Sequence, residues 1–228
     1  MRRGAVAVAV VACLAMAACA SEDDRVRVVR LGSAPPAETR ITVPKAGPEG
    51  FTPPGSWPKA CELLTQADMR AVLPDITKLT QESKQLRFTV RTPTGMDRGE
   101  RGIPGGHCTY IFYLSGTESE EYQESYKGWL NVTVEVAGHP DIVAQNYENM
   151  AHGTRTDALG AERCVEQMAG EYFCRTRRLA FTVHAVQLPY GFRFADQPAD
   201  AEDMTSYFHE HAVPELVRAV TAKLERPG

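Results

Sequence analysis

The chain has 228 residues, of which 43% are hydrophobic and 24% are charged, and its formal net charge is −4. This composition is typical of a folded protein and excludes a disordered or fibrous chain. The acidic balance gives the surface no general attraction for nucleic acid or anionic lipid, so no nucleic-acid partner is expected.

Residues 1–18 have the features of an export signal. Arg2 and Arg3 precede an uncharged apolar run from Gly4 to Ala18, which is short for a bilayer core of roughly 30 Å. Cys19 follows small residues, a pattern that resembles the lipobox of bacterial lipoproteins. The resemblance implies that Cys19 is lipidated and becomes the new N-terminus, holding the protein at the membrane by its lipid. The alternative is an ordinary Ala-x-Ala signal, which would release a soluble secreted protein.

Residues 19–58 are expected to form a tether between the lipidated cysteine and the folded domain. Seven of the fifteen prolines fall between Ala20 and Pro58, and such a composition does not build a core. Within the tether, residues 25–31 alternate Arg and Val, which fits either an edge strand or a basic strip near anionic headgroups. Cleavage before Cys19 removes two arginines, and the net charge becomes −6.

Residues 59–228 are long enough for a single domain with its own core. Thr65 and Asp68 form a capping-box pattern that predicts a short helix, which Pro74 ends. The remaining pattern predicts these elements in chain order: a strand over 85–92, a glycine-rich loop over 93–106, strands over 107–114 and 129–138, a helix over 140–153, two or three antiparallel strands over 163–188, and a helix over 200–224.

Four cysteines remain in the predicted domain, which indicates two disulfides in an exported protein, with three pairings possible. Cys164 and Cys174 are equidistant from Ala169, so a hairpin centred there places them directly opposite each other, within the reach of a disulfide. The pair that remains is Cys61 with Cys108. No C-x-x-C pair is present, so a structural role is expected for both bonds, and zinc is not expected.

The order of elements predicts an α+β domain: one antiparallel sheet with helices packed on one face, braced by the two disulfides.

The sequence contains no catalytic motif, and neither a catalytic residue nor a cofactor is expected. Ser115, Ser125, His107 and His184 are the candidates for a hydrolase site assembled in space. On a helix, the His209 and His211 side chains point about 200° apart, so they are not expected to bind one metal ion.

Arg175, Arg177 and Arg178 are the candidates for binding an anionic ligand or partner. Arginines that flank a strand in this way also occur without any binding role, and the sequence leaves both readings open.

Four segments together resemble an actinobacterial lipoprotein family, the one defined by domain of unknown function number 3558. They are "KACELLTQADMRAVL", "GGHCTYIF", "DALGAERC" and "EYFCRTRRLAFTVHA". The matching residues are Cys61, Leu63, Leu64, Thr65, Cys108, Tyr110, Leu159, Gly160, Cys164 and Cys174. The resemblance implies an envelope location and disulfides, but it implies no activity.

These observations together predict a lipid-anchored protein on the extracytoplasmic face of the cell membrane. The expected function is that of a non-enzymatic accessory module, which binds an unknown small ligand or another envelope protein. A purely structural envelope protein is the first alternative, and a hydrolase with a Ser/His site is the second.

Overall fold

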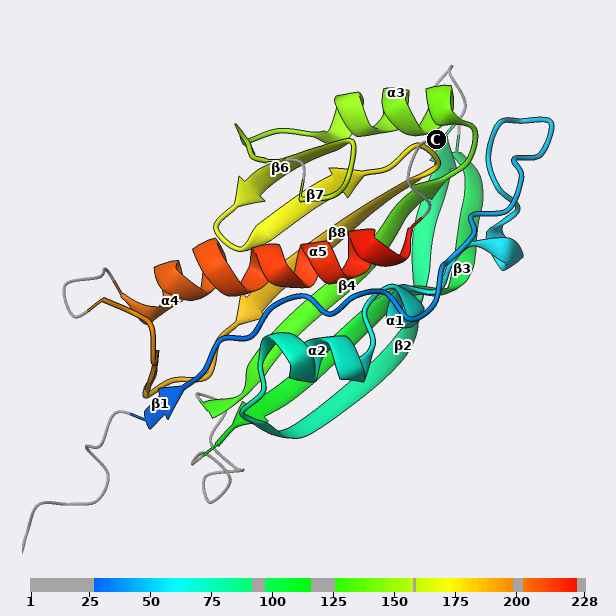
Figure 1. The fold of residues 1–228 in the computed structure, drawn as a ribbon. Helices are drawn as coiled ribbons and strands as arrows, with labels where there is room; N and C mark the ends of the chain where they lie inside the picture. Colours follow the sequence, from blue (N-terminus) through cyan, green and yellow to red (C-terminus); the bar gives the residue numbers. More distant parts are fainter. Residues whose placement is uncertain (1–26, 92–96, 116–125, 158, 199–202, 225–228) are drawn as a thin grey trace, which may run out of the picture.

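The computed structural model describes residues 27–91, 97–115, 126–157, 159–198 and 203–224. Seven strands form one antiparallel sheet in the order β2-β3-β4-β8-β7-β6-β5 (Figure 1). Their bounds are β2 (Ile76–Arg91), β3 (Asp97–Leu114), β4 (Gly128–Ala137), β5 (Thr154–Arg155), β6 (Arg163–Met168), β7 (Glu171–Arg175) and β8 (Leu179–Gln187). The sheet confirms the predicted α+β class.

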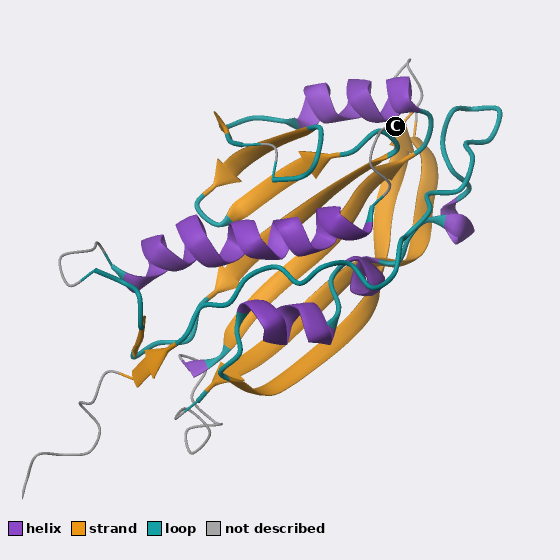
Figure 2. Ribbon diagram, in the orientation of Figure 1, coloured by secondary structure: helices purple, strands orange, loops and turns teal. Residues whose placement is uncertain are grey.

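Helices α1 (Ala60–Leu63), α2 (Gln66–Val72) and α5 (Val213–Lys223) cover one face of the sheet, here called the helix face (Figures 1 and 2). Alternation along β4 explains why they pack there, because Leu130, Val132 and Val134 are fully buried on this face. The Thr65–Asp68 capping box is present at the start of α2, as predicted. None of the described helices is long and apolar enough to cross a membrane.

Helix α3 (Pro140–Met150) packs on the opposite sheet face, here called the far face. Tyr172 and Cys174 of β7 belong to the core under the helix face. Phe173 lies between them in the strand and belongs to the separate core on the far face. Phe173 instead packs against Tyr147 of α3, with ring centroids 4.7 Å apart. The expectation that helices pack on one face therefore holds for α1, α2 and α5 but not for α3.

The β4 strand contributes to both cores because its register is irregular. A register shift between Val134 and Val136 moves Val136 into the cluster under α3, although simple alternation places it with Val134. Alternation of side chains along β4 therefore predicts the correct face for Leu130, Val132 and Val134 but the wrong face for Val136.

Both predicted disulfides are formed. Cys164 and Cys174 are direct partners in the β6–β7 hairpin, with Cα atoms 4.1 Å apart. Cys61 of α1 is bonded to Cys108 of β3 and ties the first helix to the sheet. The bonds thus link parts of one core and have a structural role.

The predicted loop over 93–106 is wrong, because β3 already begins at Asp97. Strands β2 and β3 pair as far as Arg91 and Asp97, so the hairpin is much longer than the glycines suggested. A register shift between Lys84 and Leu86 accommodates the irregular glycine segment.

The predicted tether is also wrong for residues 27–58, because they pack on the domain. This segment is called the strap. Strand β1 (Arg27–Val29) pairs in parallel with β9 (Phe192–Phe194). Val29 and Trp57 are 1% and 9% exposed. The segment lacks enough apolar residues for a core of its own, but it completes the core of the domain. The structured unit therefore begins before residue 59, and the edge-strand reading holds for residues 27–29.

The C-terminal helical region has three consecutive parts. Helix α4 (Met204–Tyr207) continues through a π-helical segment, η5 (Phe208–Ala212), into α5. The π-helical segment ends at Ala212, two residues before Pro214, and a proline inside a helix is a common cause of such an irregularity.

Candidate functional site

The candidate site is a cavity of about 350 Å³ at one end of the sheet, called here the end cavity. Three segments form it: the β6–β7 turn, the end of β8 with the connection to β9, and the start of the C-terminal helical region. Its main side chains are those of Met168, His184, Val186, Tyr190, Met204 and His209.

Gly170 allows the three segments to meet. It has a φ of +75°, which the tight β6–β7 turn requires, and its carbonyl accepts a hydrogen bond from Ala185 N at 2.9 Å. The His209 ring lies against it so closely that an added Cβ would be 2.4 Å from the ring. The Tyr172 hydroxyl also donates to the His209 carbonyl at 3.2 Å. The wall that carries His209 is therefore held by contacts on both sides.

The lining of the end cavity combines an apolar rim with a few polar side chains. Met168, Val186 and Tyr190 are 56%, 41% and 70% exposed, so its rim is apolar and open to solvent. Burial lowers the pKa of His209, which favours the neutral imidazole. A cavity with thioethers, a phenol and a neutral imidazole can hold an apolar body and hydrogen-bond a polar end.

A second cavity, of about 360 Å³, lies where η5 and the start of α5 meet the strap near Leu31. Two of its charged side chains already bind within the chain. Glu215 pairs with Arg218 and accepts a hydrogen bond from Ala34 N at 2.8 Å. This cavity is a weaker candidate because Glu215, one of its charged groups, already holds the strap in place.

His107, one of the two histidines considered for a hydrolase site, is hydrogen-bonded to two threonines. Its Nδ1 lies 2.9 Å from Thr133 Oγ1, and its Nε2 lies 3.3 Å from Thr109 Oγ1. Burial lowers the pKa of His107, and the nearby positive charge of Lys84 adds to this effect. The ring is therefore held in a polar row on the far face.

The candidate serines do not complete a site with His107. Ser115 follows the end of β3, about 27 Å along the strand from His107 at the usual rise per residue. Ser125 lies outside the described residues. His184 lines the end cavity and is paired with Asn131 of β4, whereas His107 is paired with Thr133.

The three candidate arginines do not converge on one point. Arg175 pairs with Glu162 at 3.3 Å and lies over the Tyr147 ring. Arg178 donates to the Gly138 carbonyl at 3.4 Å and to the Pro44 carbonyl at 2.6 Å, so it holds the strap. Arg177 is exposed. Binding of an anion by these residues stays a prediction.

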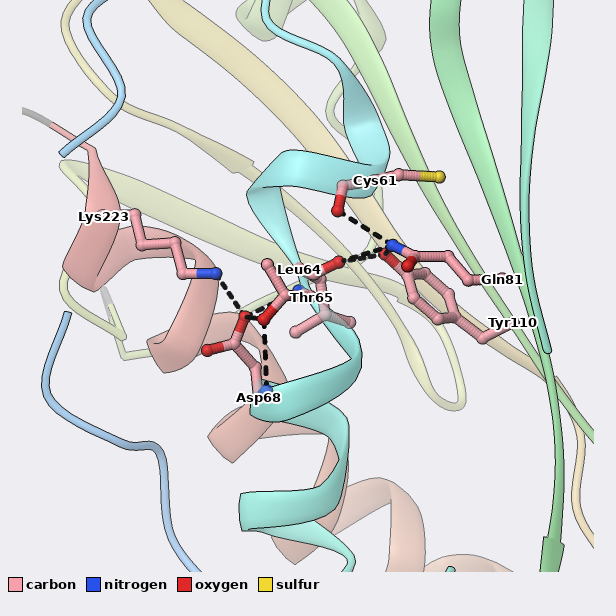
Figure 3. Close-up of polar contacts among 7 residues, drawn as sticks. All are labelled: Cys61, Leu64, Thr65, Asp68, Gln81, Tyr110 and Lys223. Atoms are coloured by element: carbon pink, nitrogen blue, oxygen red, sulfur yellow. Dashed lines mark hydrogen bonds and ion pairs between the residues drawn. The ribbon is translucent and has the colours of Figure 1, made fainter. Parts of the chain in front are cut away.

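A buried ion pair joins α2 to α5. The Lys223 ammonium contacts Asp68 Oδ2, which also accepts from the Thr65 backbone N at 2.6 Å and the Thr65 hydroxyl at 2.7 Å (Figure 3). Asp68 thus caps α2 and binds the last turn of α5 at the same time.

A second polar group beside this ion pair connects α1 to the sheet (Figure 3). The Tyr110 hydroxyl donates to the Leu64 carbonyl. Gln81 Nε2 donates to the Cys61 carbonyl at 2.9 Å and to the Leu64 carbonyl at 3.3 Å. Burial raises the pKa of Tyr110, so its hydroxyl stays a donor. These polar atoms are satisfied within the chain, which indicates a structural role.

Comparison with protein-family models, with curated proteins and with solved structures finds no match for the chain. The family resemblance stays a prediction. The residues that carry it lie in the framework of the domain and outside the end cavity: Leu63, Leu64, Cys108, Tyr110, Cys164 and Cys174 are buried core residues. Its Leu159 has a φ of 48°, and its carbonyl accepts from the Thr221 hydroxyl at 2.7 Å.

His184 was expected as a hydrolase candidate and His209 as a helix-surface residue, and neither was expected in a cavity. Met168, Val186, Tyr190 and Met204 come from three separate segments, and nothing in their local patterns indicates that they meet. One local signal was present: Gly170 in the predicted hairpin turn, against which the His209 ring packs.

Proposed function

We propose that this protein is a non-enzymatic binding module, anchored by a lipid on Cys19 to the extracytoplasmic face of the cell membrane. Cys19 lies outside the described residues, and its motif supports the anchor. The two disulfides support an oxidising compartment, because such bonds persist mainly outside the cytoplasm. The end cavity then binds a small, largely apolar ligand that carries one polar end.

The apolar rim of the end cavity is the observation that carries the binding proposal. A ligand that covers the exposed side chains of Met168, Val186 and Tyr190 removes their apolar surface from water. This removal favours binding by about 25 cal/mol per Å². His184 and His209 supply polar atoms beside this rim. Binding of such a ligand requires no catalytic side chain in the rim.

The anchor is tested on the protein recovered from membranes. The expected result is an N-terminal peptide that begins at Cys19 and carries diacylglycerol. The Cys19→Ser variant is expected to lose this mass and to leave the membrane fraction. An unmodified N-terminal peptide from membrane-bound protein would overturn the anchor.

The binding site is tested on the exported Cys19→Ser chain with the fluorescent apolar probe N-phenyl-1-naphthylamine. Val186→Trp places an indole at the rim and is expected to reduce probe binding about tenfold or more, equivalent to about 1.4 kcal/mol. Met150→Trp is the matched control, since Met150 is similarly exposed, at 43%, but lies outside the cavity.

Native mass spectrometry of the same three chains gives a second readout. We expect a co-purified mass in the Cys19→Ser chain and in its Met150→Trp variant, and its loss in the Val186→Trp variant. Equal probe binding by all three chains, without a co-purified mass, would contradict the binding function and favour a purely structural role.

A further inference from the structure

Most of the strongly exposed apolar side chains gather at one end of the molecule. Among the described residues, six large apolar side chains are at least 41% exposed: Val28, Phe51, Met150, Met168, Val186 and Tyr190. Met168, Val186 and Tyr190 form the rim of the end cavity, and Val28 lies on β1 beside the connection that carries Tyr190. These four residues are called the end patch.

The β1–β9 ribbon makes Val28 part of this patch. Arg27 N donates to the Gly191 carbonyl at 3.2 Å, which places β1 directly beside the segment containing Tyr190. Val28 is paired with Arg193, and both side chains are exposed. The buried side of the ribbon already packs on the domain through Val29 and Phe194. Its exposed side therefore presents an apolar and a cationic side chain together.

The chain limits how far this end can move from the membrane. Residues 27–58 are bound to the domain as the strap, so only residues 20–26 connect Cys19 to it. At about 3.6 Å per residue, that connection reaches about 29 Å when fully extended. A domain of this size has a radius of gyration of about 16 Å, so its diameter exceeds this reach. The start of β1 therefore stays within about 29 Å of the lipidated cysteine.

We propose that the end patch lies against the lipid surface, with Val28, Val186 and Tyr190 at the level of the headgroups. This inference rests on the lipid anchor in the proposed function. The diacylglycerol on Cys19 already supplies two acyl chains for attachment, so contact of the end patch would set the orientation of the domain on the bilayer. Tyrosine favours the interface because its ring is apolar and its hydroxyl is polar.

Charge supports the same orientation. Arg193 is exposed in the middle of the ribbon and can meet the phosphate of a lipid headgroup. The chain as a whole is acidic, so an anionic membrane repels its other faces on average. The loop that contains Phe51, whose backbone bridges to Gly138 before α3, lies at the opposite end from β1 (Figure 1). Phe51 is therefore expected to point away from the lipid surface.

The test uses the full lipidated protein in vesicles of phosphatidylethanolamine and phosphatidylglycerol, with and without acyl-brominated phosphatidylcholine. Bromine quenches an indole that lies at the bilayer surface. We expect Tyr190→Trp to show roughly twofold or greater loss of its added emission, since interfacial groups enter about 5–10 Å into the headgroup region. The matched control is Phe51→Trp, also at an exposed aromatic residue, and its added emission is expected to stay unchanged. Trp57 and Trp129 give the same background in both.

A second variant checks that the patch itself makes the contact. Adding Val28→Asp to Tyr190→Trp places a charge on an exposed side chain and is expected to halve the quenching roughly, because an apolar contact is replaced by a hydrated carboxylate. Vesicle flotation is measured on every sample. Protein that floats but shows equal quenching at residues 190 and 51 would overturn the docking proposal alone and leave the patch to a protein partner. Protein that does not float would overturn the anchor and the docking proposal together.

Discussion

Asp68 and Lys223 lie 155 residues apart in the sequence, and their side chains form an ion pair in which they are only 7% and 6% exposed. The pair links the start of α2 to the end of α5 on the helix face. Thr65 also donates to Asp68, so Asp68 Oδ2 accepts from the Thr65 backbone N and hydroxyl as well as contacting Lys223. The end of the chain is thus fixed to the first part of the domain.

Removing one partner of this pair is expected to destabilise the fold strongly. Lys223→Met keeps most of the side-chain volume but leaves Asp68 as a buried charge, so the free energy of unfolding should fall by about 3–5 kcal/mol. Lys59→Met is the matched control, because Lys59 pairs with Glu62 at the surface, where both are about 60% exposed, and should cost under about 1 kcal/mol. Urea unfolding of both variants measures the difference. Equal losses would contradict the structural role of the buried pair.

The two disulfides are expected to contribute unequally. Their cysteines are 47 and 10 residues apart, and in the chain-entropy model such loops contribute about 4 and about 2.5 kcal/mol. Replacing Cys61 and Cys108 together by Ala should therefore lower stability more than replacing Cys164 and Cys174 together. Denaturant unfolding of the two double variants tests the order. The reverse order would indicate that the β6–β7 hairpin depends on its disulfide for more than chain entropy.

Glu135 is expected to oppose folding at neutral pH. Burial raises its pKa, and the charge of Glu171 adds to this effect, while the hydrogen bond from Thr182 acts against it. A raised pKa means that the folded state loses stability as pH rises through that pKa. Glu135→Gln keeps an acceptor for Thr182 and should raise the melting temperature at pH 7.5. The gain should shrink toward pH 4, where the wild-type carboxyl is protonated. A gain that does not depend on pH would contradict the electrostatic cause.

His107 has the opposite sign of pH dependence. Its pKa is lowered from 6.5 in the fold, so below about pH 6.5 the unfolded chain takes up a proton that the folded chain resists. Stability is therefore lost as pH falls from 7 to 5. His107→Asn should lose less stability over this range, as thermal melts at several pH values would show. His152→Asn, at an exposed histidine, is the control and should follow the wild type.

The parts of the fold that the sequence predicted depend on residues close together in the chain. The capping box of α2 needs only Thr65 and Asp68, and the β6–β7 disulfide needs only the equal spacing of two cysteines about a turn. In both cases the physical cause lies within about ten residues. The second disulfide then followed because two cysteines remained.

The parts that the sequence did not predict depend on distant partners. Glycines over 93–106 suggested a loop, but pairing with β2 supplies hydrogen bonds that extend β3 through them. The end cavity combines three segments whose individual patterns show no sign of meeting, and α3 reaches the far face because Phe173 lies there for Tyr147 to cover.

Removal of the strap should destabilise the domain, although composition alone placed the start of the domain after residue 58. Without residues 20–58, the chain loses buried Val29 and Trp57 and uncovers Phe192 and Phe194, which are 3% and 0% exposed. Each such side chain contributes about 1.5–3 kcal/mol by burial. The shortened Cys19→Ser chain should therefore unfold at much lower urea concentration or aggregate.

Two further chains make this result specific to packing. Removal of residues 20–26 alone should leave the urea midpoint unchanged, because the strap is kept whole. Trp57→Ala in the otherwise intact chain should cost about 3–5 kcal/mol, since it creates a cavity and also removes the hydrogen bond that Trp57 Nε1 donates to the Thr52 carbonyl at 2.6 Å. If the chain without residues 20–58 were as stable as the intact one, the strap would be a tether after all. The short reach from Cys19, on which the docking of the end patch depends, would then no longer hold.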